Sequence, residues 1–277
     1  MKVSYYPGCS LDGTAREYGE SVQTIAGLLD VELAELEDWT CCGASSAHAT
    51  SDRLATALPA RNMELADKAG LDLVIPCAAC YQRLKAADKE LRAAGDSYKG
   101  DFKVKHLVDF LWEDVGEKTL TARVKKPLSG LSMVCYYGCL ITRPPRVTDA
   151  LRPDDPRAMD NILKTTGAEV RNWSFKTECC GGSLMFTQPA IAMKMTERLL
   201  AMAREAGAEC IATGCPVCLS NLDMMQSEIS RATGKSYGIP IFYVSELLGL
   251  AFGQPAGRWL KGHLTDTRPL LRQKGLL

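Results

Sequence analysis

The amino-acid sequence predicts an α/β protein built of two pseudo-symmetric, Rossmann-like domains, each with a small parallel sheet flanked by helices. Two observations lead to this prediction. A spaced set of five cysteines occurs twice along the 277 residues, and in both copies short apolar strands alternate with helical stretches. Such alternation favours βαβ units and a parallel sheet. A chain of 277 residues also fits two compact domains of about 100–150 residues each.

The strands are expected to end at the cysteines. In the first copy we predict strands at residues 2–6, 31–36 and 71–75, and in the second copy at residues 131–137, 168–173 and 209–212. Helices are expected at residues 15–29, after Cys80 and after Cys218. A further helix follows the second Cys-Cys pair, where the apolar period runs through Leu184, Ile191, Met195, Leu199 and Met202.

Ten of the twelve cysteines belong to the repeat. Each copy has a single Cys after Gly, an adjacent Cys-Cys-Gly, and a Cys-x-x-Cys. In both copies 34 residues separate the last two segments, whereas 31 and 39 residues separate the first two. The sets are Cys9, Cys41, Cys42, Cys77 and Cys80, then Cys139, Cys179, Cys180, Cys215 and Cys218. An eight-residue insertion explains the difference, and proline and charge place it in a surface loop at residues 143–157.

The repeat divides the chain into a first domain at residues 1–122, a second at 123–253, and a tail at 254–277. The linker is expected near residues 116–130. The polar tail is expected to be solvated or frayed, and the alternative is that it forms a docking arm for a partner protein. Because parallel strands place their carboxyl ends at one rim, each set of five thiols should gather there. Helix N-termini at that rim suit an anionic cluster.

Composition narrows the functional class. Apolar residues make up 46 % and charged residues 24 %, with Lys+Arg and Asp+Glu balanced at 33 each. This balance argues against a nucleic-acid partner, because phosphate contacts need a basic face. The N-terminus has no apolar signal region, and no apolar run approaches the ~18–20 residues that span a bilayer. We expect a cytoplasmic protein with no direct membrane insertion.

Cysteine richness in a reducing compartment indicates metal or redox chemistry rather than a disulfide framework. A structural zinc ion takes four ligands, and so does a cubane iron–sulfur cluster. Five matched cysteines are one more than either requires, whereas an extended, non-cubane cluster would use all five. Soft thiolates favour iron–sulfur or zinc over hard cations, so zinc remains an alternative at this point.

The pattern Cys-x31-Cys-Cys-x34-Cys-x-x-Cys, followed by Cys-x39-Cys-Cys-x34-Cys-x-x-Cys, resembles the duplicated cysteine-rich CCG domain found in the B subunit of heterodisulfide reductase. The resemblance covers residues 1 to about 250. It implies two non-cubane 4Fe-4S clusters, one per domain, with all ten cysteines as metal ligands. A disulfide such as the coenzyme M–coenzyme B heterodisulfide would be cleaved between them, so the chemistry is assigned to the clusters and to no catalytic side chain.

The same resemblance implies partners. Electrons would arrive through a ferredoxin-like C subunit, fed by a flavoprotein A subunit, since no C-x-x-C-x-x-C run for a cubane cluster is present. CCG domains also occur in lactate-, glycolate- and quinone-linked oxidoreductases. An electron-relay subunit of such an enzyme is therefore a second hypothesis, and a zinc-binding module is a third. The sequence identifies neither the disulfide nor the physiological direction of the reaction.

Several residues outside the two sets are expected to be structural. Cys135 and Cys210 lie in predicted strands and should be core thiols. His48 could line a cleft, although a packed or surface histidine is the simpler interpretation, and His106 is expected to be structural and His263 part of the tail. The paired tyrosines at 5–6 and 136–137 should pack in the strand core. Three basic residues could meet an anionic substrate, although solvated surface charge is the expected role: Arg16, Arg143 and Lys176.

Overall fold

A computed structural model describes residues 1–44, 47–95, 98–255, 257 and 259–277. Within these residues the strands form two four-stranded parallel sheets with matching orders, β2-β1-β3-β4 and β6-β5-β7-β8. The predicted α/β class with two repeated parallel sheets is therefore confirmed. The strands are β1 Lys2–Tyr5, β2 Glu32–Glu35, β3 Leu73–Ile75, β4 Val104–His106, β5 Ser132–Tyr136, β6 Glu169–Val170, β7 Cys210–Thr213 and β8 Ile241–Tyr243.

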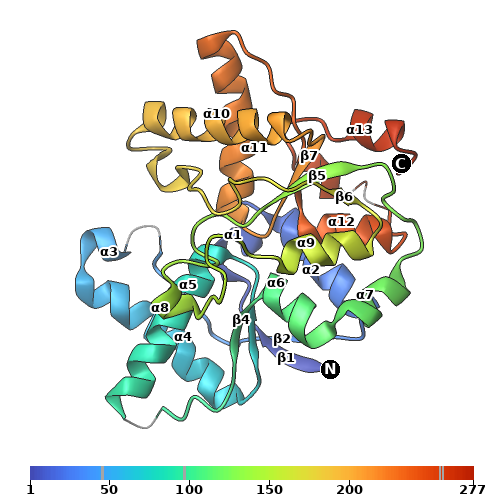
Figure 1. Cartoon of the computed structure of the whole chain (residues 1–277). Coiled ribbons are helices and arrows are strands. Elements are labelled where there is room, and N and C mark those ends of the chain that lie inside the picture. The colour runs from blue at the N-terminus through green and yellow to red at the C-terminus, as the bar shows by residue number, and fades with distance from the viewer. Residues whose placement is uncertain (45–46, 96–97, 256, 258) are drawn as a thin grey trace.

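Helices connect the strands of each sheet and cover its faces (Figure 1). We call the part with β1–β4 the first half and the part with β5–β8 the second half. The helices of the first half are α1 Gly8–Asp12, α2 Arg16–Leu28, α3 Ala47–Thr50, α4 Asp52–Ala69, α5 Ala78–Ala94, α6 Leu107–Phe110 and the π-helical turn η1 Leu111–Val115. The remaining helices are α7 Glu117–Arg123, α8 Pro145–Thr148, α9 Ala158–Thr165, η2 Gly182–Leu184, α10 Pro189–Glu205, α11 Pro216–Thr233, α12 Val244–Ala251, η3 Trp259–Lys261 and α13 Arg268–Gln273.

Local sequence explains the elements that position the cysteines. All five residues of β5 are buried, as expected for a parallel strand covered on both faces. Helix α2 buries Tyr18, Val22 and Ile25, which recur at the spacing of one helical face. Helix α4 begins where the Ser51 side chain accepts a hydrogen bond from the Leu54 N–H, a standard N-cap.

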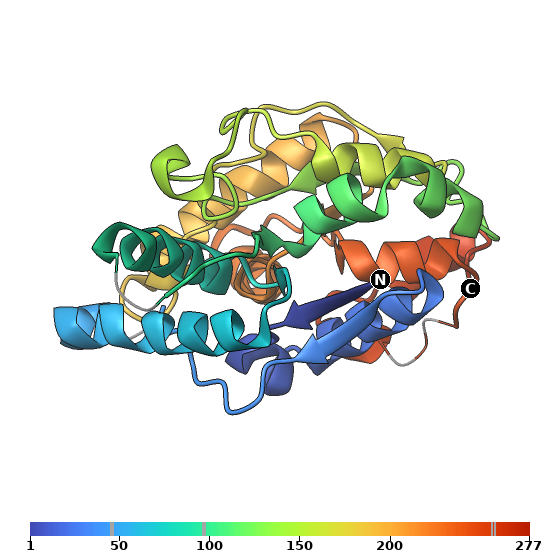
Figure 2. The ribbon, with the colours of Figure 1, turned by 90° about the horizontal axis from the view of Figure 1, so that it is seen from below.

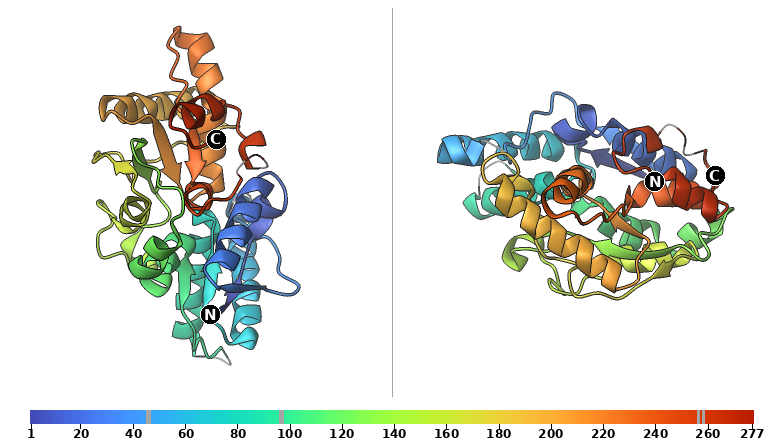
Figure 3. Two further views of the ribbon diagram at one scale, coloured as in Figure 1. Left: turned by 90° about the vertical axis from the view of Figure 1, so that its right-hand side faces the viewer. Right: turned by 90° about the horizontal axis from the view of Figure 1, so that it is seen from above.

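The two halves pack through helices that contact each other across the interface. Helix α2 of the first half contacts α12 of the second, and α6 of the first half contacts α9 of the second. Figures 2 and 3 show the same arrangement from other sides, and in Figure 1 both chain termini lie on the side of the molecule away from α3. Because buried side chains of both halves form one continuous core cluster, the halves are not separate bodies.

Two expectations about connections are corrected, and the expected linker at residues 116–130 contains a helix, α7, which packs on α9. Helices α5 and α11 begin inside the Cys-x-x-Cys segments, at Ala78 and Pro216, rather than after them. The insertion at residues 143–157 is not only a surface loop. Its helix α8 packs on α5 of the first half, where the Tyr81 hydroxyl donates to the Thr148 carbonyl.

The tail differs most from the expectation, because it is packed rather than frayed. Trp259 and Leu271 are buried, and the Trp259 ring lies so close to Gly249 that a Cβ there would be 2.5 Å from it. His263 is also buried, and its Nε2 atom lies 3.0 Å from Glu246 Oε1. The tail also contacts the first half, through η3 and α2, so residues far apart in sequence pack it against both halves.

Candidate metal centres

The five thiols of the first half lie at the carboxyl ends of β1, β2 and β3. Cys9 lies in α1 directly after β1, and the Cys41-Cys42 pair follows β2. The Sγ atoms of Cys41 and Cys9 are 3.8 Å apart, and those of Cys42 and Cys80 are 3.2 Å apart. The first pair is exposed at the surface, whereas Cys42, Cys77 and Cys80 are buried. The set therefore has an outer pair and an inner group.

The second half repeats this pairing. Cys139 and Cys179 contact each other through their side chains, and the Sγ atoms of Cys180 and Cys218 are 3.9 Å apart. Cys139 and Cys179 are partly exposed, whereas Cys180, Cys215 and Cys218 are buried. The structure thus places each Cys-Cys pair beside the Cys-x-x-Cys of its own half, as the cysteine spacing predicts.

The two sets meet at the interface between the halves. Cys77 and Cys215, the first cysteines of the two Cys-x-x-Cys segments, interact through their side chains, and both are buried. Strand order explains the contact, because β3 and β7 are inner strands at equivalent places in their sheets. The ten thiols therefore form one continuous region rather than two distant sites.

Backbone N–H groups face the sulfur atoms of both sets. The Gly43 N–H donates to Cys41 Sγ at 3.4 Å, and the Gly181 N–H donates to Cys179 Sγ at 3.3 Å. Both glycines have positive φ, +74° and +81°, a conformation that favours glycine. N–H bonds of this kind stabilise negative charge on sulfur.

Glycines also let sulfur approach the backbone. A Cβ built on Gly8 would lie 3.0 Å from Cys80 Sγ, and one on Gly138 would lie 2.9 Å from Cys218 Sγ. Both residues have positive φ, +73° and +68°. The matching geometry of the two halves explains why each single cysteine is preceded by glycine.

Two tyrosines anchor the Cys-Cys segments, a role that the sequence analysis did not identify. The Tyr6 hydroxyl donates to the Thr40 carbonyl, and the Tyr136 hydroxyl donates to the Glu178 carbonyl, both at 2.7 Å. Each carbonyl belongs to the residue before a Cys-Cys pair. The signal was present in the sequence, because both tyrosines lie three residues before the single cysteine of their copy.

Several thiols are stabilised as thiolates. A hydrogen bond with Cys80 lowers the pKa of Cys42 to about 7, and a hydrogen bond with Cys139 lowers the pKa of Cys179 to about 6. Contact with Cys218 and Cys77 lowers the pKa of Cys215 as well. Since the thiolate is the form that binds metal, these groups are prepared for soft cations.

Other candidate residues lie apart from the thiols or are already paired. Cys135 and Cys210 are fully buried, as expected of core thiols. Lys176 is buried too, contrary to the expectation of a solvated charge, and its Nζ lies 2.6 Å from Asp160 Oδ1. Arg143 forms an ion pair with Asp154, Arg16 donates to the Asp12 carbonyl, and His106 is buried. The side chain of His48 lies outside the described residues.

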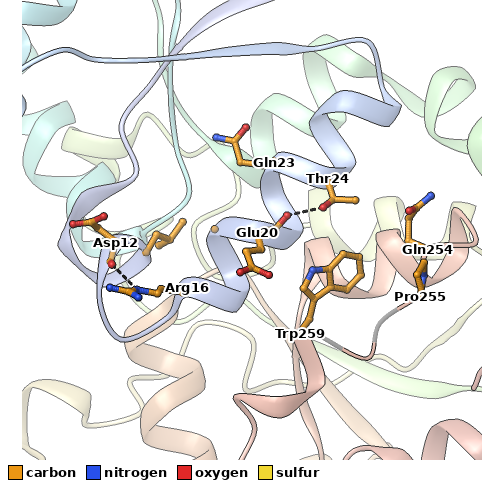
Figure 4. A pocket seen from close by; sticks show the side chains of 10 residues that line it. Asp12, Arg16, Glu20, Gln23, Thr24, Gln254, Pro255 and Trp259 are labelled. Carbon is orange, nitrogen blue, oxygen red and sulfur yellow. Dashed lines mark hydrogen bonds between the residues drawn. The ribbon is translucent and has the colours of Figure 1, made fainter.

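An open cavity of about 590 Å³ lies between α2 and the segment after α12 (Figure 4). Its lining includes Arg16, Glu20, Gln254 and Trp259 but none of the cysteines. Figure 4 shows Trp259 and Gln254 on the side opposite α2. This cavity is therefore separate from the thiol region.

The donor set fits an iron–sulfur group. The sulfur atoms form pairs, with N–H donors aimed at Cys41 and Cys179. Thiolates with such donors are the ligands that iron–sulfur clusters use.

Two parallel sheets that each present five thiols define a duplicated cysteine-rich domain protein. The profile of the CCG family, described as a cysteine-rich domain, matches residues 3–85 and 133–223. The chain belongs to this CCG family, and the resemblance to the B subunit of heterodisulfide reductase is confirmed at the level of family.

Similar proteins come from bacteria and archaea. The chain is 35 % identical to the 8-methylmenaquinol:fumarate reductase membrane anchor subunit of Wolinella succinogenes over 92 % of this chain and 93 % of that protein. It is 29 % identical to the B subunit of the ferredoxin/F420H2-dependent CoB-CoM heterodisulfide reductase of Methanosarcina acetivorans, over 91 % of this chain and 89 % of that protein.

A solved structure shares the fold. A hypothetical protein from Helicobacter pylori superposes with a TM-score of 0.73 at 11 % identity, over 96 % of this chain. This chain spans about half of that protein, 52 %. Of the helices within the described residues, none combines the length and apolar character needed to cross a membrane.

Proposed function

We propose that the chain is the disulfide-reducing subunit of a heterodisulfide reductase-type complex. In this proposal each half binds one non-cubane 4Fe-4S cluster through its own five cysteines. When bound, the two clusters supply the two electrons that cleavage of one disulfide requires. The observation that supports this best is the contact between Cys77 and Cys215, because it brings the two ligand sets together across the interface.

The chain's own residues have four tasks in this function. The cysteines hold the metal, and the N–H groups of Gly43 and Gly181 stabilise charge on sulfur. The exposed pair Cys9 and Cys41 and the partly exposed pair Cys139 and Cys179 leave the outer side of each set open to a substrate. The buried thiols exclude water from the inner side, which raises the strength of local electrostatic interactions.

The ligand assignment is tested with the double variant Cys41→Ala/Cys179→Ala. We expect it to lose bound iron and disulfide reduction, measured on anaerobically purified protein with an artificial electron donor and a panel of disulfides. Cys135→Ala, which removes a core thiol outside both sets, is the matched control. Full activity and full iron in the double variant would contradict the proposal, as would one or two zinc ions in place of iron.

The relatives also support partner proteins. Several of them are named as subunits of reductase complexes. In this proposal the electron donors are the ferredoxin-like C and flavoprotein A subunits of such a complex, and the assembly works in the cytoplasm. Co-purification of the tagged chain from its host, followed by fractionation, tests both points.

A quinol-linked electron relay is the second candidate. The 35 % identity to a protein named for 8-methylmenaquinol:fumarate reductase favours it specifically. The two functions differ in their substrates, so a direct comparison separates them. Oxidation of a menaquinol analogue without reduction of any disulfide would select the relay, and the opposite result would select the disulfide reductase.

A further inference from the structure

Two buried side chains hold the two Cys-x-x-Cys segments against each other. Pro76 and Gly214 are the residues directly before Cys77 and Cys215, and their carbonyl groups share the same two neighbours. His106 Nε2 lies 3.1 Å from both carbonyl oxygens, and the Tyr18 hydroxyl lies 3.2 Å from both. The hydrogens of the two donor groups therefore face two carbonyl oxygens, and each half supplies one of these oxygens.

The hydrogen bonds of His106 fix its tautomer. The Val108 N–H donates to Nδ1 at 3.2 Å, so Nδ1 is the acceptor and Nε2 carries the proton that faces the carbonyl groups. Burial also lowers the pKa of His106 to about 4, which keeps the ring neutral. The imidazole is thus oriented as a donor toward Pro76 and Gly214.

Packing holds both donors in place. A Cβ on Gly214 would lie 3.0 Å from His106 Cε1 and 3.0 Å from Val108 Cγ2, so the ring fills the space that a larger residue would need. The Tyr18 ring stacks on Tyr243 of the second half, with centroids 3.9 Å apart and planes at 4°. Each donor therefore contacts both halves.

We propose that Tyr18 and His106 are positioning residues that set the separation of the two thiol sets through the Pro76 and Gly214 carbonyl groups. The inference rests on the proposed function, because a fixed separation lets both sets act on one disulfide. A hydrogen bond from either donor resists movement of one Cys-x-x-Cys segment relative to the other. Loss of one donor leaves a single hydrogen to be shared by two buried carbonyl groups, which is unfavourable.

Tyr18→Phe tests this with a matched control. It removes only the hydroxyl that meets the carbonyl groups, whereas Tyr243→Phe removes a buried hydroxyl with no hydrogen-bond partner among the described residues from the ring stacked on it. In Tyr18→Phe we expect amide hydrogen exchange about tenfold faster in peptides containing Cys77 and Cys215. The magnetic interaction between the two reduced clusters, measured by electron paramagnetic resonance, should change while bound iron stays constant.

Histidine provides a second, independent comparison. His106→Ala should show the same changes. His106→Gln should show smaller changes, because its side-chain amide can still donate a hydrogen bond. Equal behaviour of Tyr18→Phe and Tyr243→Phe would overturn the inference, as would His106→Ala with unaltered exchange. A wild-type chain without iron would contradict the proposed function instead, and the exchange comparison would still decide whether the two donors hold the segments together.

Discussion

The two halves place their thiols alike but are enclosed differently. Both pair the single cysteine with the Cys-Cys segment and the Cys-Cys segment with the Cys-x-x-Cys. Within the described residues, only the second half carries α8, which reaches α5 of the first half, and it is followed by a packed tail that contacts α12 and α2. The comparison teaches that the connections after matching strands keep the thiol sites alike in both halves. The longer segments, which contain α8 and the tail, join the two halves to each other.

Single-cysteine variants test whether the halves load metal independently. Cys80 and Cys218 occupy matching positions, and Cys80→Ala and Cys218→Ala should each lose about half of the bound iron if each removes a ligand of one of the two proposed clusters. Iron and acid-labile sulfide are measured per chain, with Cys135→Ala as the control. Loss of all iron from either variant would show that the sets form one centre.

Matching positions on α6 and α12 differ in their electrostatics. Burial raises the pKa of Asp109 to about 7, so the folded state retains a proton that the unfolded state has released above about pH 4. Ionisation of Asp109 in the unfolded state therefore lowers the free energy of unfolding as the pH rises from about 4 to 7. Asp109→Asn should remove that decline and stabilise the chain by about 2 kcal/mol at pH 8, measured by urea unfolding.

Glu246, the counterpart of Asp109, has His263 as a partner. Burial opposes the charged form of His263, but the hydrogen bond to Glu246 and the negative charges around the ring together outweigh it and raise the pKa. Asp223 and Glu17 also face this histidine. The stabilisation that protonated His263 provides is complete below the pKa of His263 in the unfolded state. It is lost as the pH rises through the pKa of His263 in the folded state. His263→Gln should therefore destabilise the chain more at pH 5 than at pH 9, and a constant loss would contradict this assignment.

Gly138→Ala tests the approach of sulfur to the backbone. The new Cβ would meet Cys218 Sγ at 2.9 Å with φ at +68°, so we expect a loss of about 2–3 kcal/mol in unfolding free energy together with reduced iron. Gly275 has nearly the same φ, +67°, and open space around it. Gly275→Ala should lose only about 1 kcal/mol and keep its iron.

The contact between α8 and α5 gives the smallest effects. Tyr81→Phe removes the hydroxyl that donates to Thr148 and should lower the unfolding free energy by about 1 kcal/mol. Lys89→Ala removes a partly exposed ion pair with Asp149. It should change the unfolding free energy by roughly a few tenths of a kcal/mol, because water screens the charges. Equal losses in the two variants would show that the hydroxyl contributes nothing specific.

The fold and the thiol positions could be predicted because both depend on local pattern. Each predicted strand precedes a cysteine segment in the structure, although β6 is shorter than expected at Glu169–Val170. Each Cys-Cys segment follows β2 or β6 and each Cys-x-x-Cys follows β3 or β7, the strands on either side of β1 or β5, and the parallel order brings both segments to one rim of the sheet. Local periodicity could not reveal that His263 meets Glu246, or that α8 meets α5, because such contacts join residues whose separation leaves no repeat in the sequence.

The hydroxyl anchors illustrate the same limit. Tyr6 and Tyr136 looked like core aromatics, since their strands are apolar, and only the structure shows their hydroxyls at the Thr40 and Glu178 carbonyl groups. Tyr18 gave no signal at all, because its partners Pro76 and Gly214 lie 58 and 196 residues away.

Packing of α2 against α12 has a consequence for synthesis of the chain. Helix α2 is synthesised long before α12, so its buried face stays uncovered until α12 has been made. During that interval the inner thiols of the first half lack their neighbours from the second. The interface between the two thiol sets can therefore form only after synthesis has passed α12.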